Sequence, residues 1–390
     1  MTRDVLVIGA GIVGAAIARS LARRGVTVVV VDRGPAVGGT SGAGEGNLLV
    51  SDKGPGPELE LAKYSLGLWR TWAAELRTEL DARFASIEYV AKGGVVVATS
   101  AGGADALRGF AARQQRAGVE AHFLDASEAR ALEPELGPAV VAGVHYPQDA
   151  QVQPVIAAEA ILASARRSGA RVLPGTTVTG PEVDRSGRLV GVRTTKGTLR
   201  ADVVIVAAGP WSGEVARTLG GTLRIGPRKG LLLVTARMGP RVRHKVYDAD
   251  YVGAVQSDDR ALQTSTVIES TESGTILIGS SRQDVGFDGR VEVSVLRAIA
   301  SRAIGLMPFL ADATVIRAYG GFRPFSPDHL PVIGPAPGVP GLWYATGHEG
   351  AGIGLAPATG ELVAASLLGE TTALEIDPFR ADRATLSGAA

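Results

Sequence analysis

The sequence of 390 residues contains no cysteine. Without a thiol, the chain cannot form a disulfide, use a cysteine nucleophile or ligate an iron–sulfur cluster through thiolates. A flavin linked through cysteine is excluded for the same reason. Any iron–sulfur cluster that serves this protein must therefore lie in a partner chain.

An excess of charge of either sign is also missing, because 40 basic and 39 acidic side chains leave a formal net charge of +1. A nearly neutral chain has no broad electrostatic attraction for nucleic acid or for an anionic membrane. Aromatic residues make up 5% of the sequence, but 45% of the residues are hydrophobic, which is enough for a large core in one to three domains. We therefore expect a small-molecule substrate.

The sequence also has little that resembles a membrane span or a metal site. Glycines interrupt its apolar start, VLVIGAGIVGAAIA, and no run approaches the roughly 20 apolar residues that cross a bilayer. This start also has no basic leader and no cleavage site. The five histidines are scattered, and no two of them have the spacing of metal ligands. We expect no membrane span, a cytoplasmic location and no metal.

A regular β-α-β pattern opens the chain. Residues 4–8 and 26–32 are apolar enough for buried strands, and residues 12–24 have the spacing of a helix between them. Such a unit is typical of a parallel sheet covered by helices. The sequence therefore predicts an α/β protein.

Glycines stand where this first strand turns into its helix, in the motif GAGIVG. Gly9 permits the tight turn, Gly11 lets the backbone approach a pyrophosphate, and Gly14 allows close helix packing. The helix N-terminus adds unpaired N–H groups and positive potential. Asp32, at the end of the next strand, is placed to bind an adenosine ribose. The pattern predicts a bound dinucleotide, either NAD or FAD.

In the rest of the chain the expected strands and helices alternate less regularly than in this first unit, and we find no internal repeat. Apolar spacing predicts helices over 57–80, 154–168, 291–307 and 351–368, strands over 94–98, 203–209 and 342–347, paired strands within 170–201, and a β-rich segment over 223–280.

Several stretches together resemble the D-amino-acid oxidase family of FAD-dependent oxidoreductases. Besides GAGIVG, they are GGTSGAGEGN (38–47), DAQVQP (149–154), GTTVTG (175–180), ADVVIVAAGPWS (201–212), GGFRPFSPDHLPVIGP (320–335) and ATGHEGAGIGLAPATGE (345–361). The segment EGNLLVSDKGPGPE is also similar to the flavoprotein β-subunits of opine oxidases, hydrogen cyanide synthase and D-hydroxyproline dehydrogenase. Two positions depart from the family: Asp32 replaces a glutamate, and Gly44 often corresponds to asparagine.

The resemblance implies a Rossmann-like FAD-binding domain interleaved with a substrate domain made of a mainly antiparallel sheet and helices. The expected division assigns residues 1–85, 145–215 and 318–372 to the FAD-binding domain, 86–144 and 216–317 to the substrate domain, and 373–390 to a C-terminal tail.

The resemblance also implies non-covalent FAD and a set of residues around it. These are Gly9, Gly11, Ile12, Val13, Gly14, Asp32, Arg33, Thr40, Ser41, Gly46, Asn47, Val178, Ala208, Gly209, Trp211, Gly321, Arg323, His348, Gly350, Ala351, Gly352, Ile353 and Gly354. In GHEGAGIG the backbone amides at a helix N-terminus would face the flavin and stabilise negative charge on its reduced form. His348 is more readily explained as a structural residue of that loop than as a proton carrier.

The family pattern Gly-x-Arg-Pro places Arg323 beside the flavin as the group that binds a substrate carboxylate. A guanidinium suits this task because its planar fork makes two charge-assisted hydrogen bonds. Taken alone, Arg323 would more readily be explained as one end of a structural ion pair or as the brace of a loop. Tyr247 and Tyr251 are candidates for a second carboxylate contact, or are ordinary tyrosines of strands.

We therefore expect an FAD-dependent oxidase or dehydrogenase that oxidises the C–N bond of a small amino acid, which could be glycine, a D-amino acid or an N-substituted amino acid. A flavin enzyme acting on 2-hydroxy acids is the first alternative. The second is a flavoprotein subunit that is inactive alone. Either a homo-oligomer or a hetero-oligomer with an iron–sulfur or other electron-acceptor subunit fits the sequence.

Overall fold

The computed structural model describes residues 4–249 and 262–387. Its helices are α1 Ile12–Ala22, α2 Pro57–Glu79, α3 Ala101–Arg116, α4 Ala126–Leu132, α5 Pro154–Arg167, α6 Ser212–Thr218, α8 Val293–Leu306, α9 Gly352–Leu368 and α10 Ala384–Ser387. Its strands are β1 Asp4–Ile8, β2 Thr27–Val31, β3 Asn47–Leu48, β4 Gly94–Ala98, β5 His122–Asp125, β6 Ala142–Tyr146, β7 Ala150–Gln151, β8 Arg171–Leu173, β9 Val178–Val183, β10 Leu189–Thr194, β11 Gly197–Arg200, β12 Val203–Val206, β13 Gly226–Thr235, β14 Lys245–Asp248, β15 Gln263–Ser270, β16 Ile276–Arg282, β17 Val315–Phe325, β18 Val332–Pro335 and β19 Leu342–Thr346.

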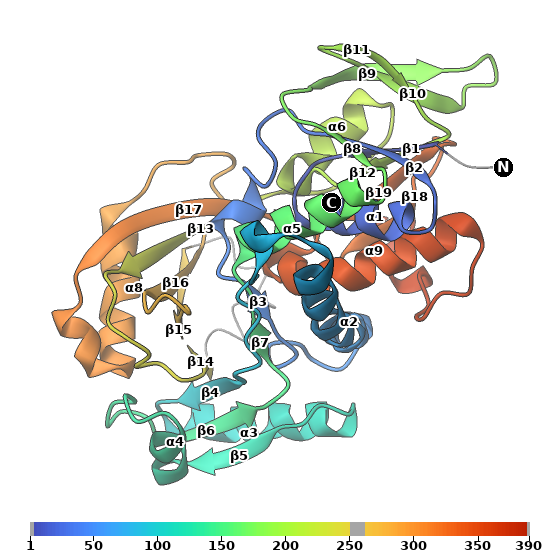
Figure 1. Ribbon diagram of the computed structural model, residues 1–390. Coiled ribbons are helices and arrows are strands. Elements are labelled where there is room, and N and C mark those ends of the chain that lie inside the picture. The colour runs from blue at the N-terminus through green and yellow to red at the C-terminus, as the bar shows by residue number, and fades with distance from the viewer. Residues whose placement is uncertain (1–3, 250–261, 388–390) are drawn as a thin grey trace.

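Two large sheets organise the chain (Figure 1). The first has the order β18-β19-β12-β1-β2-β8, in which every neighbouring pair except β18 and β19 is parallel. The second has the order β17-β13-β16-β15-β14-β4-β6-β5, and all of its pairs are antiparallel except β14 with β4. The predicted Rossmann-like sheet and mainly antiparallel second sheet are confirmed.

Smaller sheets complete the fold. β9, β10 and β11 form an antiparallel sheet at the top of Figure 1, and β3 pairs with β7 between the two large sheets. The expectation that the whole of residues 170–201 forms paired strands was wrong at its start, because β8 joins the first sheet beside β2. The expected domain boundary at residue 318 falls inside β17, which is continuous in the second sheet. The exact division into domains stays a prediction.

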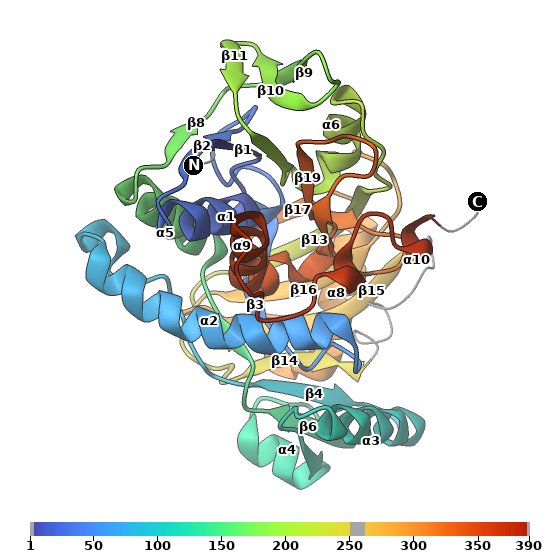
Figure 2. The same ribbon diagram turned by 90° about the vertical axis from the view of Figure 1, so that its right-hand side faces the viewer.

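Helix α9 lies at the centre of the core, where it packs against α1 and α2 (Figure 2). Close packing with α1 needs Gly360, because a Cβ there would lie 2.7 Å from the Ala16 carbonyl oxygen. Within the described residues, the segment Glu349–Leu368 is long and apolar enough to cross a membrane by length and composition. The expectation that no apolar run reaches that length was therefore wrong. Most of this segment is buried inside the protein, as in a core helix.

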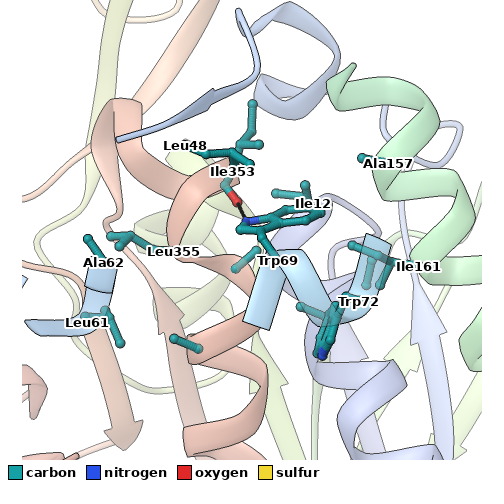
Figure 3. Close-up of a cluster of buried hydrophobic side chains, with 14 of the residues drawn as sticks. Ile12, Leu48, Leu61, Ala62, Trp69, Trp72, Ala157, Ile161, Ile353 and Leu355 are labelled. Carbon is teal, nitrogen blue, oxygen red and sulfur yellow. Dashed lines mark hydrogen bonds between the residues drawn. The ribbon is translucent and has the colours of Figure 1, made fainter. Parts of the chain in front are cut away.

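A proline inside α9 leaves one carbonyl of its first turn without a helical partner. Pro357 has no N–H to donate to the Ile353 carbonyl four residues earlier. The indole nitrogen of Trp69, in α2, donates to that oxygen at 3.1 Å instead (Figure 3). Ser65 Oγ, one turn earlier in α2, donates to the Gly354 carbonyl at 2.6 Å. Two side chains of α2 therefore hold the start of α9.

We expect Trp69→Phe to lower the free energy of unfolding by about 1–3 kcal/mol, because it leaves the buried Ile353 carbonyl without a donor. Urea unfolding of the purified protein measures this. Trp72→Phe is the matched control, because Trp72 is also buried in α2 but packs beneath the Arg19 guanidinium, 4.2 Å from it. An equal loss in the two variants would contradict the role of the hydrogen bond.

Candidate active site

A cavity of about 430 Å³ lies where the two large sheets approach each other. The carboxyl ends of β1, β2, β12 and β19 open into it, as do β13, β17 and the start of α9. Ligands of open parallel sheets bind at this end of the strands. Of the predicted site residues, the cavity is lined by Gly9, Gly11, Ile12, Val13, Asp32, Arg33, Thr40, Ser41, Gly46, Asn47, Val178, Ala208, Gly209, Trp211, Gly321, Arg323, His348, Gly350, Gly352 and Ile353.

The turn between β1 and α1 is built by glycines at which an added Cβ would meet backbone atoms. Gly9 has φ +115°, and a Cβ at this position would lie 2.3 Å from the Ala207 carbonyl oxygen. A Cβ at Gly14 would lie 1.9 Å from the Gly9 carbonyl oxygen, so Gly14 packs the helix onto the turn and does not itself line the cavity. The N-terminus of α1, capped by Gly11, thus faces open space with its positive potential.

Two polar side chains secure the loops around this turn. Ser41 Oγ accepts a hydrogen bond from the Ile12 N–H at 3.0 Å. Asp32 accepts from the Ala10 N–H at 2.8 Å and from the Gly34 N–H at 2.9 Å. Each carboxylate oxygen of Asp32 therefore already holds one backbone donor and keeps a second lone pair. Its contact with a ribose stays a prediction.

An aromatic wall closes one side of the cavity. Trp211 stacks on Phe287 with ring centroids 5.2 Å apart, and the Arg33 guanidinium lies 4.3 Å from the Trp211 ring. Phe287 also meets the edge of Phe322, whose carbonyl accepts a hydrogen bond of 2.5 Å from Thr40. This wall joins the 3₁₀ turn Gly209–Trp211, which follows β12 of the first sheet, to strand β17 of the second sheet. Sequence reasoning missed Phe322, which lines the cavity, although it adjoins the arginine of a motif. Phe287 packs behind this wall and lies outside the lining.

The start of α9 forms the opposite end of the cavity. A short 3₁₀ turn, Glu349–Ala351, leads into the helix, and Gly350 and Gly352 line the cavity. Gly354 does not, because it packs against β3, where its Cβ would lie 3.1 Å from the Asn47 carbonyl oxygen. Ala351 is also absent from the lining. The helix N-terminus therefore presents Gly350, Gly352 and Ile353 to the cavity.

Arg323 lies in strand β17 and not in a loop. Its Nη1 donates to the Ser281 carbonyl at 2.9 Å. A Cβ at Gly230, in the neighbouring strand, would lie 2.3 Å from the same Nη1, so the guanidinium extends flat over that glycine. Arg323 also lies close to Gly350 before α9, because a Cβ built on Gly350 would be 3.5 Å from Arg323 Nε. Pro324 is tolerated beside it because β17 is the edge strand of its sheet.

The match to known proteins runs along nearly the whole chain. A family model described as FAD dependent oxidoreductase (DAO) matches residues 4–366. The chain belongs to this family. It is therefore an FAD-dependent oxidoreductase, and the expected enzyme class and cofactor are confirmed.

Three relatives show the extent of the similarity. Glycine oxidase from Geobacillus kaustophilus (strain HTA426) is 31% identical over 385 residues, 97% of each chain. A crystal structure of glycine oxidase from that species superposes with a TM-score of 0.86, at 30% identity, over 98% of this chain and 99% of the other. Iminodiacetate oxidase (IdaA) from Chelativorans sp. BNC1 superposes with a TM-score of 0.83, at 26% identity, over 97% and 98%. Hydrogen cyanide synthase subunit HcnC from Pseudomonas aeruginosa is 35% identical over 267 residues, which are 68% of this chain and 60% of HcnC.

The cavity of this FAD-dependent oxidoreductase fits its cofactor. The space beside Gly9 and Gly11 would admit a pyrophosphate, because these positions carry no Cβ and adjoin the α1 N-terminus. Asp32 and Val178 would hold the adenosine end, and Gly350 and Gly352 would face the flavin end. These roles of single residues stay predictions.

His348 is buried beside the cavity, and burial lowers its pKa to about 3. Thr359 Oγ1 donates to the Leu355 carbonyl, so it accepts from His348 Nε2 at 3.0 Å. The imidazole is therefore neutral in the folded enzyme near pH 7. This agrees with a structural role and not with that of a proton carrier.

We expect the neutral His348 to make stability fall with acid. Its folded pKa lies below its ordinary value of about 6.5, so the unfolded chain binds one more proton between pH 6.5 and 3. The stability of the wild type relative to His348→Gln should drop by about 2 kcal/mol between pH 7 and pH 5. Urea unfolding at the two pH values measures this difference. If the stability difference between the wild type and His348→Gln does not change with pH, His348 is not held neutral by burial.

Tyr247 does not line the cavity as expected. Tyr247 is fully buried, and its hydroxyl is bonded to Ser51 and to Asp149, the latter at 3.1 Å. It lies outside the cavity lining, so the structure gives it a place in the core network and no direct substrate contact. Tyr251 lies outside the described residues. Among the described residues, no group of three or more histidine, aspartate or glutamate side chains could hold a metal.

Proposed function

We propose that the enzyme oxidises the C–N bond of a small amino acid, which is glycine, a D-amino acid or an N-substituted amino acid such as an opine or D-hydroxyproline. The position of Arg323 in the cavity wall carries this proposal. The names of two relatives, glycine oxidase and iminodiacetate oxidase, support it.

FAD, when bound, would supply the two-electron acceptor for the hydride of the substrate Cα. Arg323 would hold the substrate carboxylate through two hydrogen bonds and so orient Cα–H. Its hydrogen bond to the Ser281 carbonyl holds the guanidinium over Gly230 before substrate arrives, so that little conformational freedom is lost on binding. The amine becomes an imine, which water hydrolyses to a 2-oxo acid.

A substrate screen under nitrogen tests this proposal. Wild-type enzyme loaded with FAD is mixed with glycine, sarcosine, D-alanine, D-proline, glycolate and D-lactate, and bleaching of the flavin absorbance is followed. We expect bleaching by at least one amino acid and slower bleaching by its hydroxy analogue. Bleaching by the hydroxy acids alone would overturn the proposal in favour of a 2-hydroxy-acid dehydrogenase.

A second candidate function is that of a flavoprotein subunit that needs a partner. The name of HcnC, a subunit of hydrogen cyanide synthase, supports it. The chain has no cysteine, so an iron–sulfur cluster would come from that partner. Admitting air after the screen distinguishes the two, because an oxidase recovers its flavin absorbance within seconds and a subunit awaiting its partner stays bleached. The expected cytoplasmic location remains a prediction.

A further inference from the structure

The segment that follows α9 leads to the short helix α10 (Figure 2) and is tied to the loop that follows β17. Arg383, just before α10, binds the Asp328 carboxylate with Nε 2.6 Å from Oδ2 and Nη2 2.7 Å from Oδ1. The same guanidinium donates to the Leu330 carbonyl at 2.8 Å and to the Pro331 carbonyl at 3.1 Å. The family model ends at residue 366, so this arginine lies beyond the residues that the model matches.

Asp328 is the centre of the turn that Arg383 holds. It also accepts from Thr385 Oγ1 at 2.6 Å and from Ser326 Oγ at 3.1 Å. Burial by itself would raise the pKa of Asp328, but the hydrogen bonds from Arg383 and Thr385 lower it to about 2. The carboxylate is therefore ionised near pH 7. The next residue, His329, donates its N–H to the Ser326 carbonyl at 3.0 Å, so the turn that carries His329 is closed on both sides.

His329 and Glu349 form a pair in which both backbones are left-handed, with φ +58° and +45°. This conformation is unfavourable for a residue that has a side chain. Nδ1 of His329 lies 2.9 Å from Oε1 of Glu349, and it is the donor because an ionised carboxylate can only accept. Backbone strain of this kind persists only where the surrounding contacts hold it, and it clusters at functional sites. The pair is therefore a candidate for a role in the site.

His329 contacts both elements that flank Arg323. Its ring meets the edge of Phe325, with ring centroids 5.5 Å apart, and Phe325 lies two residues after Arg323 on the same face of β17. Glu349 lines the cavity and begins the 3₁₀ turn before α9. The next residue of that turn, Gly350, lies against the Arg323 stem, because its Cβ would be 3.7 Å from Arg323 Cδ. A shift of either element would change the direction of the guanidinium.

We propose that His329 is a positioning residue of the substrate site, and that the C-terminal segment holds it in place through Arg383 and Asp328. His329 fixes the end of β17 and the start of α9 around Arg323, so that the guanidinium meets the substrate carboxylate in one orientation. This inference rests on the proposed function, because it needs Arg323 to bind a carboxylate.

The test uses the full-length enzyme loaded with FAD and the amino acid of the panel that bleaches the wild type fastest. Acetate, which has a carboxylate and no amine, serves as a competitive ligand. We expect His329→Ala and Arg383→Ala each to raise KM for the amino acid and the inhibition constant of acetate about 10-fold or more, because a small misplacement of a binding group has a cost of this size. A purely structural role would lower stability but leave both constants of the folded enzyme unchanged.

Arg380→Ala is the matched control, because Arg380 lies in the same segment but is exposed and pairs with Asp382. It should change neither constant by more than about twofold. His329→Asn is the rescue variant. Asparagine adopts a left-handed backbone more readily than alanine, and its amide can donate to Glu349. We expect His329→Asn to recover most of the affinity that His329→Ala loses.

A double variant tests whether the two residues act through one chain of contacts. His329→Ala combined with Arg383→Ala should bind acetate no more weakly than the weaker single variant, because the effects of residues in one network are not additive. If His329→Ala yields no folded enzyme, the comparison of Arg383→Ala with Arg380→Ala decides. Unchanged constants in the folded variants would overturn the inference, and so would additive losses or a His329→Asn as weak as His329→Ala.

Arg323→Lys separates a failure of this inference from a failure of the proposed function. If this variant binds acetate as the wild type does, the carboxylate assignment has failed and the inference falls with it. If Arg323→Lys weakens acetate and His329→Ala does not, the inference alone has failed. If only hydroxy acids bleach the wild type, the proposed C–N oxidation has failed, and the acetate constants still test the role of His329.

Discussion

Replacing Arg323 with lysine is expected to raise KM for the preferred amino acid about 10- to 100-fold, which corresponds to the loss of a hydrogen bond between charged groups. A lysine ammonium is a point charge and cannot present the two parallel N–H donors of a guanidinium. It would also lose the contact with the Ser281 carbonyl that aims the arginine across Gly230. Steady-state kinetics of the variant measure the effect.

The FAD content of Arg323→Lys should equal that of the wild type, because the glycine turn and the start of α9 are untouched. Arg317→Lys is the matched control, since Arg317 lies in the same strand but is exposed and outside the cavity. Its KM should be unchanged. If Arg323→Lys has the same KM as the wild type, Arg323 does not bind the substrate carboxylate. A loss of FAD from this variant would point to a role of Arg323 in cofactor binding.

Gly9→Ala should yield an enzyme without FAD, or no folded enzyme. The added methyl group would lie 2.3 Å from the Ala207 carbonyl oxygen and 2.7 Å from its carbon. Both atoms belong to the backbone and cannot move away by a change of rotamer. β1 and β12 would therefore have to separate at the point where the cofactor binds. The ratio of flavin absorbance to protein absorbance after purification measures occupancy.

Gly25→Ala provides the control for backbone strain. Gly25 also has a positive φ, +77°, but a Cβ there would meet nothing within 4 Å. It should cost about 1 kcal/mol of stability, the ordinary penalty for a left-handed non-glycine residue, and should keep its FAD. A normal FAD content in Gly9→Ala would contradict the tight fit of this turn.

Much of the cofactor end of the site could be predicted because its residues lie in short continuous segments of the sequence. Gly9, Gly11 and Gly14 act within one turn, and the strand and helix on each side of them follow from local periodicity. Most of the residues predicted around the cofactor, including Asp32 and Trp211, line the cavity, whereas Gly14, Ala351 and Gly354 do not. Their contacts with FAD stay predictions.

The substrate end could be predicted less well, because it depends on contacts between segments far apart in the chain. Thr40 meets Phe322 across 282 residues, and Glu45 meets Gly279 through the packing of a loop on a sheet. No local pattern marks such pairs. Tyr247 shows the reverse error, because its place in a β-rich segment suggested the cavity, whereas its hydroxyl bonds to Ser51 and Asp149 in the core.

The hydrogen bond from Trp69 to the Ile353 carbonyl makes the sequences of α2 and α9 depend on each other. Pro357 leaves this carbonyl open, and Trp69 fills the opening. A lineage that replaced Pro357 with alanine would regain the helical N–H and could then lose the indole at little cost. Aligned relatives should therefore keep or lose this proline and this tryptophan together, and the pair would record whether two helices nearly 300 residues apart in sequence were selected as one unit.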